Sequence, residues 1–149
     1  MTTAAAAEGP REGYCIEDLA VGMSASMSRT IGEAEIVLFA GISGDVNPIH
    51  LSESYAQGSV FKGRVAHGML TAGLISGLLG ARFPGPGAIY LGQTLAFKAP
   101  VRIGDTVTVT ATVTDINAER RRVTLKTVCA VGETVVIDGE ATLLVPRRG

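Results

Sequence analysis

The sequence predicts one α+β domain in which an antiparallel β-sheet wraps around one long apolar helix. Three observations lead to this prediction. The chain has 149 residues, the length of one domain with a sizeable core. Residues 68–81 carry no formal charge and are apolar on nearly every helical face, as in a helix enclosed by other elements. From residue 88 onward apolar and polar residues alternate, without the βαβ pattern of a parallel sheet.

The limits of the domain follow from the two ends of the chain. Residues 1–13 are rich in small residues and lack the basic and long apolar regions of a secretory signal, so we expect a mobile tail. The domain is expected over residues 14–146, followed by a short C-terminal end at 147–149. The chain has two cysteines, without metal-ligand spacing, which is typical of a protein from a reducing, cytoplasmic compartment.

The first elements are expected to be a strand and a helix. Within residues 23–29, three apolar side chains alternate with three serines, the period of a half-buried strand. Thr30 and Glu33 match a capping box, in which each side chain bonds a free amide at the start of a helix. An apolar run follows, so the helix is expected to end at about Ser43.

Loops and a short turn are expected next. Gly44 supplies a left-handed helix stop, and Pro48 disfavours helical geometry at the residue before it, so residues 44–49 are expected to be an irregular loop. Ser52 is expected to cap a short turn. Residues 58–63 then form a second loop.

The long helix and the strands complete the fold. The helix is expected from about residue 66 to residue 81, and its four glycines lower its intrinsic stability, so packing must hold it. Residues 105–116 alternate valine or alanine with threonine, and residues 122–131 and 134–145 continue the pattern after short turns. These segments are expected to form an antiparallel meander.

Charge and hydropathy exclude two classes of partner. With 13 Lys and Arg residues against 14 Asp and Glu residues, the chain lacks the positive field that drives binding to phosphate backbones, so nucleic acid is not expected. As a helix, residues 68–81 would span roughly 21 Å, against a hydrocarbon core of about 30 Å, so no membrane span is expected.

One constellation of polar residues can carry chemistry. Asp45, Asn47 and His50 lie within the expected loop, and His67 and Gly68 stand at the start of the apolar helix. A carboxylate and an imidazole can move protons near neutral pH, and the amides of a helix start can stabilise a developing oxyanion. Together these groups are suited to adding or removing water beside a carbonyl group.

Each residue taken alone has a structural interpretation. Asp45 can serve as a turn residue after the glycine, His50 as a structural hydrogen-bond partner, and Asn47 followed by proline as an ordinary turn signal. A loop that only had to turn would not need three different polar functions around one proline. The combination therefore favours a catalytic site.

The segment resembles the signature of the MaoC-like, or hydratase 2, family. The signature combines an aromatic residue, a Gly-Asp-x-Asn-Pro-aliphatic-His run, Tyr-Ala, and Ala-His-Gly-Met at the start of a buried helix. The matching residues are Phe39, Gly44, Asp45, Asn47, Pro48, Ile49, His50, Tyr55, Ala56, Ala66, His67, Gly68 and Met69. The likeness extends over about residues 14–145, with one departure: Ser52 stands where members often carry aspartate, and both residue types cap helices.

The resemblance implies the hot-dog fold, a homodimer and a role in fatty acid metabolism. It also implies (R)-specific hydration of trans-2-enoyl-CoA to (R)-3-hydroxyacyl-CoA. In that reaction Asp45 and His50 would activate the water and move protons, Asn47 would orient them, and the Gly68 amide would hold the thioester oxygen. The CoA thioester is the substrate, and neither a metal nor another cofactor is expected. Long strands such as residues 105–116, with edges open to pairing, also favour a dimer through the sheet.

Substrate contacts are less specified by the sequence. Lys62, Arg64, Lys98 and Arg102 flank the expected site and are candidates for binding the CoA phosphates, although surface basic residues are usually just solvated. His67 is a further candidate for substrate binding. The preferred length of the acyl chain, and the choice between CoA and acyl carrier protein, depend on the shape of the pocket and its surroundings.

Two other functions are compatible with the same fold. A hot-dog thioesterase would use Asp45 to direct water at the thioester carbonyl, but the presence of His50 favours the hydratase. A non-catalytic module that binds acyl-CoA or acyl carrier protein would not need Asp45, Asn47 and His50 together.

Overall fold

The computed structural model describes residues 13–149, so the tail expected over residues 1–13 lies outside the described residues except for its last residue. In chain order the elements are the 3-10 helix η1 (Ile16–Asp18), β1 (Ser24–Thr30), α1 (Glu33–Ser43), α2 (Pro48–Leu51), α3 (Glu53–Gln57), α4 (Gly68–Ala81), β2 (Ile89–Phe97), β3 (Thr106–Asn117), β4 (Arg122–Val131) and β5 (Thr134–Leu144). Among these residues, no helix is long and apolar enough to cross a membrane.

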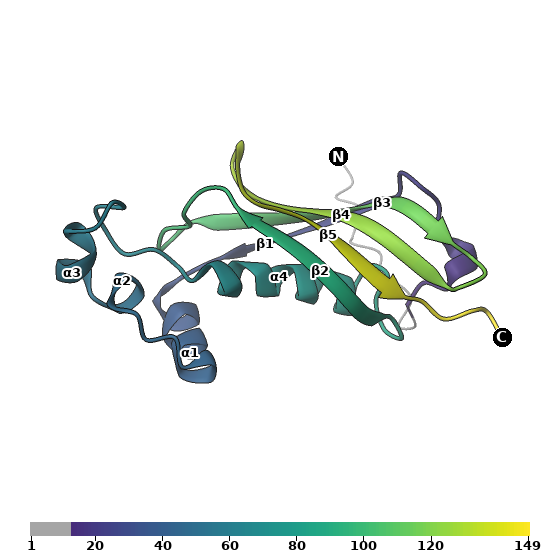
Figure 1. Cartoon of the computed structure of the whole chain (residues 1–149), viewed down its shortest axis with the longest axis horizontal. Coiled ribbons are helices and arrows are strands. Elements are labelled where there is room, and N and C mark those ends of the chain that lie inside the picture. Colours follow the sequence, from purple (N-terminus) through teal and green to yellow (C-terminus); the bar gives the residue numbers. More distant parts are fainter. Residues whose placement is uncertain (1–12) are drawn as a thin grey trace, which may run out of the picture.

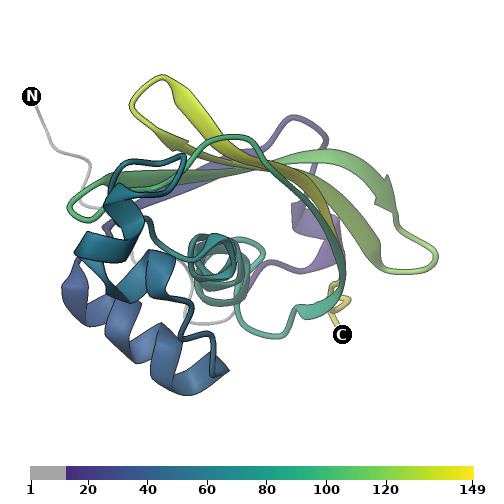
Figure 2. The same cartoon turned by 60° about the vertical axis from the view of Figure 1, so that its left-hand side comes forward.

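The strands form one antiparallel sheet in the order β1-β3-β4-β5-β2. The sheet curves over α4, and α1, α2 and α3 gather at one end of the molecule beside the start of α4 (Figures 1 and 2). The expected α+β fold, a hot-dog sheet around one long helix, is confirmed. The meander holds for β3, β4 and β5. However, β3 is an inner strand, so the open edges belong to β1 and β2 and not to residues 105–116 as expected.

The core lies between α4 and the concave face of the sheet. On α4, Ile75, Leu78 and Leu79 are fully buried, and they belong to the same cluster as the inward-facing residues of β3 and β4. The opposite side of α4 is open in the single chain: Met69 is 56% exposed, and Gly73, Ser76 and Gly80 are exposed too. The expected enclosure of α4 on nearly every face is thus wrong for one chain, because the sheet covers only one side of the helix.

The expected capping box at the start of α1 is wrong, although α1 itself ends at Ser43 as predicted. Thr30 is the last residue of β1, and its hydroxyl is hydrogen-bonded to that of Thr106 on β3 at 2.7 Å. Gly32 is the N-cap of α1, without a side-chain cap bond, and Glu33 is paired with Arg64. Pairing between strands therefore overrides the local capping signal.

The observed loops and caps agree with those predicted from the sequence, except for the residues at which the loops end. Gly44 ends α1 in the left-handed conformation with φ 77°, and Ser52 caps α3 by accepting the Tyr55 amide. The irregular loop ends at Asn47, earlier than expected, because Pro48 fits the first turn of a helix and begins α2. The long helix starts at Gly68 and not at residue 66, because His67 is a non-helical N-cap with φ −59° and ψ 134°.

Candidate active site

A cavity of about 530 Å³ opens where the loop after α1, the short helix α2 and the start of α4 meet the end of β2. Its lining brings together the residues singled out in the sequence. They are Asp45, Asn47, His50, His67, Gly68 and Lys98. The remaining walls are largely apolar, with Phe97, Val136 and Ile137 among them. A polar cluster therefore stands beside an apolar compartment, the usual composition of a small-molecule site.

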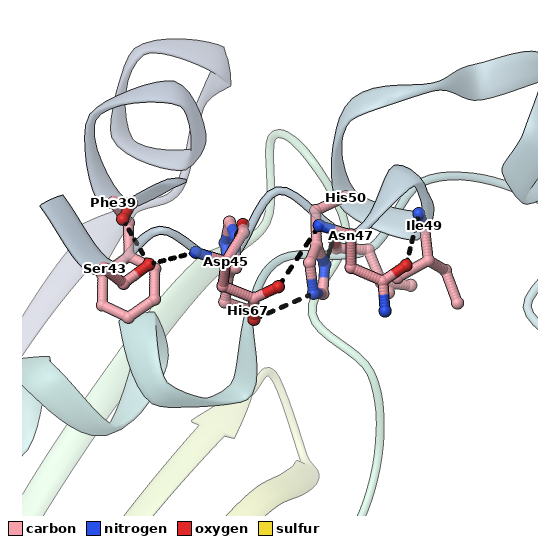
Figure 3. Close-up of polar contacts among 8 residues, drawn as sticks. Phe39, Ser43, Asp45, Asn47, Ile49, His50 and His67 are labelled. Carbon is pink, nitrogen blue, oxygen red and sulfur yellow. Dashed lines mark hydrogen bonds and ion pairs between the residues drawn. The ribbon is translucent and has the colours of Figure 1, made fainter. Parts of the chain in front are cut away.

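Asp45 is held by hydrogen bonds between side chains and main chain (Figure 3). The Ser43 hydroxyl donates to the Phe39 carbonyl at 2.7 Å and accepts the Asp45 amide at 3.0 Å. One carboxylate oxygen of Asp45, Oδ1, accepts the Asn47 amide at 3.3 Å. The other oxygen, Oδ2, remains free to face the cavity and His50.

His50 is presented by α2, which Asn47 caps. The Asn47 side-chain oxygen accepts the Ile49 amide at 3.1 Å, so this residue has a structural task that its expected role in orienting water leaves out. His50 Nδ1 lies 2.7 Å from the main-chain oxygen of Val65. Because a carbonyl oxygen can only accept, Nδ1 carries the proton, and neutral His50 therefore has its lone pair on Nε2.

Asp45 and His50 face each other across a gap. His50 Nε2 lies 3.8 Å from Asp45 Oδ2, and the His50 side chain is mostly buried whereas that of Asp45 is half exposed. With His50 neutral, both facing atoms are acceptors, so a molecule that lies beside the pair and donates two hydrogens can bond to both. Water is such a molecule, and proton loss to this pair would make it a nucleophile.

Arg64 fixes the same segment from behind. Its Nε donates to the His50 carbonyl at 2.6 Å, and its Nη1 pairs with Glu33 at 2.7 Å. The hydrogen bond from Arg64 lowers the pKa of the Glu33 carboxyl below its ordinary value. The guanidinium is thus engaged with the protein and has a structural role, while the phosphate contact expected from the sequence stays a prediction.

Gly68 is the first residue of α4, and the first amides of a helix have no partner inside the helix. The ring of Phe97 lies directly against it: a Cβ on Gly68 would come within 2.6 Å of Phe97 Cε1. The glycine therefore allows the cavity wall to approach the free amides of the helix start. These amides and the positive end of the helix dipole favour a negatively charged oxygen.

The other residues expected to contact the substrate lie in different parts of the structure. Lys98 lines the cavity and is exposed, whereas Lys62 is exposed on the loop before α4, with φ 58°. Arg102 donates to the Phe61 carbonyl at 2.6 Å. His67 is only 1% exposed and lies behind His50, with ring centroids 3.9 Å apart. Binding of substrate by Lys62, Lys98 or His67 stays a prediction.

The site has the residue types of a metal centre but not its geometry. Asp45, His50 and His67 place possible ligand atoms within 4.8 Å of one another. The two imidazoles are stacked with an interplanar angle of 30°. A metal ion lies in the plane of the imidazole that binds it, about 2 Å from the nitrogen. Two rings stacked with centroids 3.9 Å apart and inclined by only 30° do not both meet this condition for one ion. The arrangement favours proton transfer.

Two other reactive side chains lie on strands of the sheet, outside this cavity: Cys129, buried on β4, and Tyr90, partly exposed on β2. Burial raises the pKa of the Cys129 thiol to about 11. Burial, together with the neighbouring Cys129, raises the pKa of the Tyr90 hydroxyl to about 12. Neither group is therefore ionised near neutral pH, which makes both poor candidates for a nucleophile or a base.

The sequence interpretation missed Val65, Phe97 and the clamp formed by Glu33 and Arg64. Val65 acts through its main-chain oxygen, for which a side-chain pattern gives no signal. Phe97 lies far from Gly68 in sequence, and only the folding of β2 against α4 brings them together. Glu33 had a competing interpretation as a helix cap.

An antiparallel sheet around one helix, with an Asp–His pair beside the start of that helix, defines a hot-dog domain with an acid–base site. The model of the MaoC like domain matches residues 19–136 of the chain. The chain therefore belongs to the MaoC-like family.

Several relatives are similar over most of their length. The chain is 61% identical over 136 residues to an (R)-specific enoyl-CoA hydratase from Rhodospirillum rubrum, covering 91% of this chain and 94% of the relative. It is 53% identical over 132 residues to a 3-hydroxybutyryl-CoA dehydratase from Methylorubrum extorquens, covering 89% and 84%. The solved structure of an (R)-hydratase from A. caviae involved in PHA biosynthesis superimposes with a TM-score of 0.85 at 43% identity, covering 87% and 99%.

Proposed function

We propose that this protein adds water to trans-2-enoyl-CoA to give (R)-3-hydroxyacyl-CoA, and catalyses the reverse dehydration. The observation that carries the proposal is the pair of acceptors formed by Asp45 Oδ2 and His50 Nε2, 3.8 Å apart at the mouth of an apolar cavity. Relatives named as (R)-specific enoyl-CoA hydratase and 3-hydroxybutyryl-CoA dehydratase support it.

The proposed reaction uses three groups of the chain. Asp45 and His50 bind one water, take a proton from it, and the remaining hydroxide adds to C3 of the enoyl thioester. The double bond shifts to form an enolate, whose negative oxygen is stabilised by the Gly68 amide. The pair then returns the proton to C2, so atoms and charge balance. Asn47 keeps His50 in place by capping α2.

The same groups make a separate cofactor unnecessary. The base, the acid and the oxyanion donor are all supplied by this chain, and no electrons are exchanged with a second reagent. We therefore propose that the CoA thioester is the substrate and that neither a metal nor a redox cofactor takes part. Lys62, Arg64 and Lys98 remain the candidates for contacts with the CoA phosphates.

We also propose that the domain, residues 14–146, works as a homodimer that pairs through the β2 edge of the sheet. This edge exposes Ile89, Tyr90 and Leu91, and next to it Met69 is exposed on the open side of α4. A contiguous apolar surface of this kind favours burial against a second copy. Light scattering should give twice the chain mass of 15.4 kDa, and a monomer at micromolar concentration would contradict the proposal.

A cytoplasmic location is part of the proposal and accords with two free cysteines.

The test of function is a spectrophotometric assay of hydration with trans-2-enoyl-CoA substrates from four carbons upward, with the configuration of the product determined. We expect loss of the enoyl absorbance and formation of the (R) product. Release of free thiol from the acyl-CoA would identify a thioesterase instead. Binding of the thioester without any turnover would identify a non-catalytic module.

A further inference from the structure

The proposed reaction leaves one buried titratable side chain of the site without a task. His67 is the N-cap of α4 and is 1% exposed. Its ring lies between two others: Phe39 of α1, with centroids 4.8 Å apart, and His50 of α2, with centroids 3.9 Å apart. His67 is therefore shielded from solvent by the residue that we propose acts on the water.

His67 also bonds the other member of the pair. Its Nε2 lies 2.9 Å from the main-chain oxygen of Asp45 (Figure 3). A carbonyl oxygen only accepts, so Nε2 carries the proton and donates it. His67 thus has its proton on Nε2, whereas His50 has its proton on Nδ1. The two rings are stacked in opposite tautomers.

The other ring nitrogen of His67, Nδ1, indicates that packing alone does not explain why a histidine occupies this position. His67 Nδ1 is fully buried and has no hydrogen-bond partner within residues 13–149. Burying an acceptor without a partner is unfavourable, and an apolar ring of similar size would avoid that cost. A histidine at this position is explained by the hydrogen bond that Nε2 donates to Asp45.

We infer that His67 is a positioning residue that fixes the gap between the Asp45 carboxylate and the His50 imidazole. The hydrogen bond holds the main chain of Asp45, and the stacked ring fixes the plane of His50, so one side chain sets both sides of the gap. The inference rests on the proposed function, because its consequence is the placement of the water. His67 itself does not touch the reacting atoms.

The first test measures the tautomers directly and needs no activity. The chain has only two histidines, so labelling with ¹⁵N-histidine gives the signals of His50 and His67 alone, and the variant His67→Phe identifies which is which. We expect the proton on Nδ1 of His50 and on Nε2 of His67 in the wild type at a pH where both rings are neutral. A proton on Nδ1 of His67 would overturn the inference.

The second test separates positioning from packing and from binding. His67→Phe keeps a stacked ring but loses the donor, and His67→Gln keeps a donor near the place of Nε2 but loses the ring. For His67→Phe we expect kcat to fall by about 10- to 100-fold with KM nearly unchanged, as for small misplacements of catalytic groups. His67→Gln should recover part of that loss. A change confined to KM would make His67 a binding residue and overturn the inference.

A matched control comes from the same helix. Ile75→Val removes one methylene from a residue of α4 that is as buried as His67 and does not line the cavity. It should lower thermal stability while leaving kcat of the folded protein unchanged. If His67→Phe and His67→Gln behave like this control, His67 is only a packing residue. If the wild type shows no hydration, the proposed function fails, and the tautomers still decide whether His67 holds Asp45.

Discussion

Two regions of the molecule are held together by different patterns of hydrogen bonds. One is the pair of strands β1 and β3, and the other is the segment from Gly44 to His67. The strands pair in continuous register, and on the exposed face four pairs of hydroxyls bond across them at 2.7 to 3.1 Å. The segment from Gly44 to His67 contains only two short helices. Individual hydrogen bonds to the main chain help to hold it, among them those of the side chains of Ser43, Asp45, Asn47 and His50.

The difference predicts where substitutions have large effects. In the strands each hydroxyl pair repeats what its neighbours do, and the main-chain ladder continues without it. In the catalytic segment each side chain makes contacts that no neighbouring residue repeats. The effect of removing one side-chain group should therefore be small in the paired strands and severe in the catalytic segment.

The largest effect is expected for Asp45→Asn and His50→Ala. Each should lower kcat by at least about 100-fold, because general acid–base groups typically contribute 10²- to 10⁴-fold. Asn at position 45 still offers an oxygen to the Asn47 amide, so the loop should keep its course. Turnover near the wild-type rate, with an unchanged circular dichroism spectrum, would remove that residue from the mechanism.

The next effect is expected for Gly68→Ala. The added Cβ would lie 2.6 and 2.8 Å from two carbons of the Phe97 ring, so the ring must move within the cavity wall. We expect kcat/KM to fall at least about tenfold even for a four-carbon substrate, part of what losing an oxyanion donor costs. Gly41→Ala on α1, where a Cβ meets nothing within 4 Å, is the control and should leave activity unchanged. A lower melting temperature with intact activity would make Gly68 a packing residue.

A smaller effect is expected for Glu33→Gln. Because Arg64 lowers the pKa of Glu33 in the folded protein, this carboxylate stabilises the fold above its ordinary pKa of 4.5, and the contribution is lost as pH falls through the lowered value. Melting temperatures of the wild type and Glu33→Gln should therefore differ at neutral pH and converge in acid. Since Glu33 is exposed, the difference should be modest. A difference that persists in acid would contradict this assignment.

The smallest effect is expected within the hydroxyl pairs of the sheet. Ser26 and Thr110 bond at 2.9 Å on the exposed face. Ser26→Ala should cost less than about 1 kcal/mol of unfolding free energy, the range of exposed cross-strand pairs, and leave kcat unchanged. Denaturant titrations of Ser26→Ala, Thr110→Val and the double variant would measure the coupling. A loss of activity here would break the contrast between the two regions.

The regular part of the fold follows from the sequence because its signals are local and repeated. The alternation over residues 105–116 predicts β3 almost to its ends, and the uncharged run predicts α4. The places of β1 and β2 at the two edges do not follow, because each pairs with a strand that is distant in sequence. Thr30 shows how such pairing also defeats a local signal: its bond to Thr106 replaces the expected cap.

The site was predictable in its residues but not in its contacts. The run from Gly44 to His50 and the residues at the start of α4 have side chains of the right chemistry in one motif. The bond from His50 to the Val65 carbonyl and the stacking of His67 depend on main-chain positions that no residue pattern encodes. These contacts set the tautomers, and through them the direction in which protons move.

The central claim is that one Asp45–His50 pair both activates the water and protonates C2. The most direct measurement is hydration of trans-2-butenoyl-CoA in D₂O, followed by NMR determination of the relative configuration at C2 and C3. A single pair lies on one face of the substrate, so the account predicts that deuterium and hydroxyl add to the same face. Addition to opposite faces would require a second proton donor across the cavity and would contradict the account.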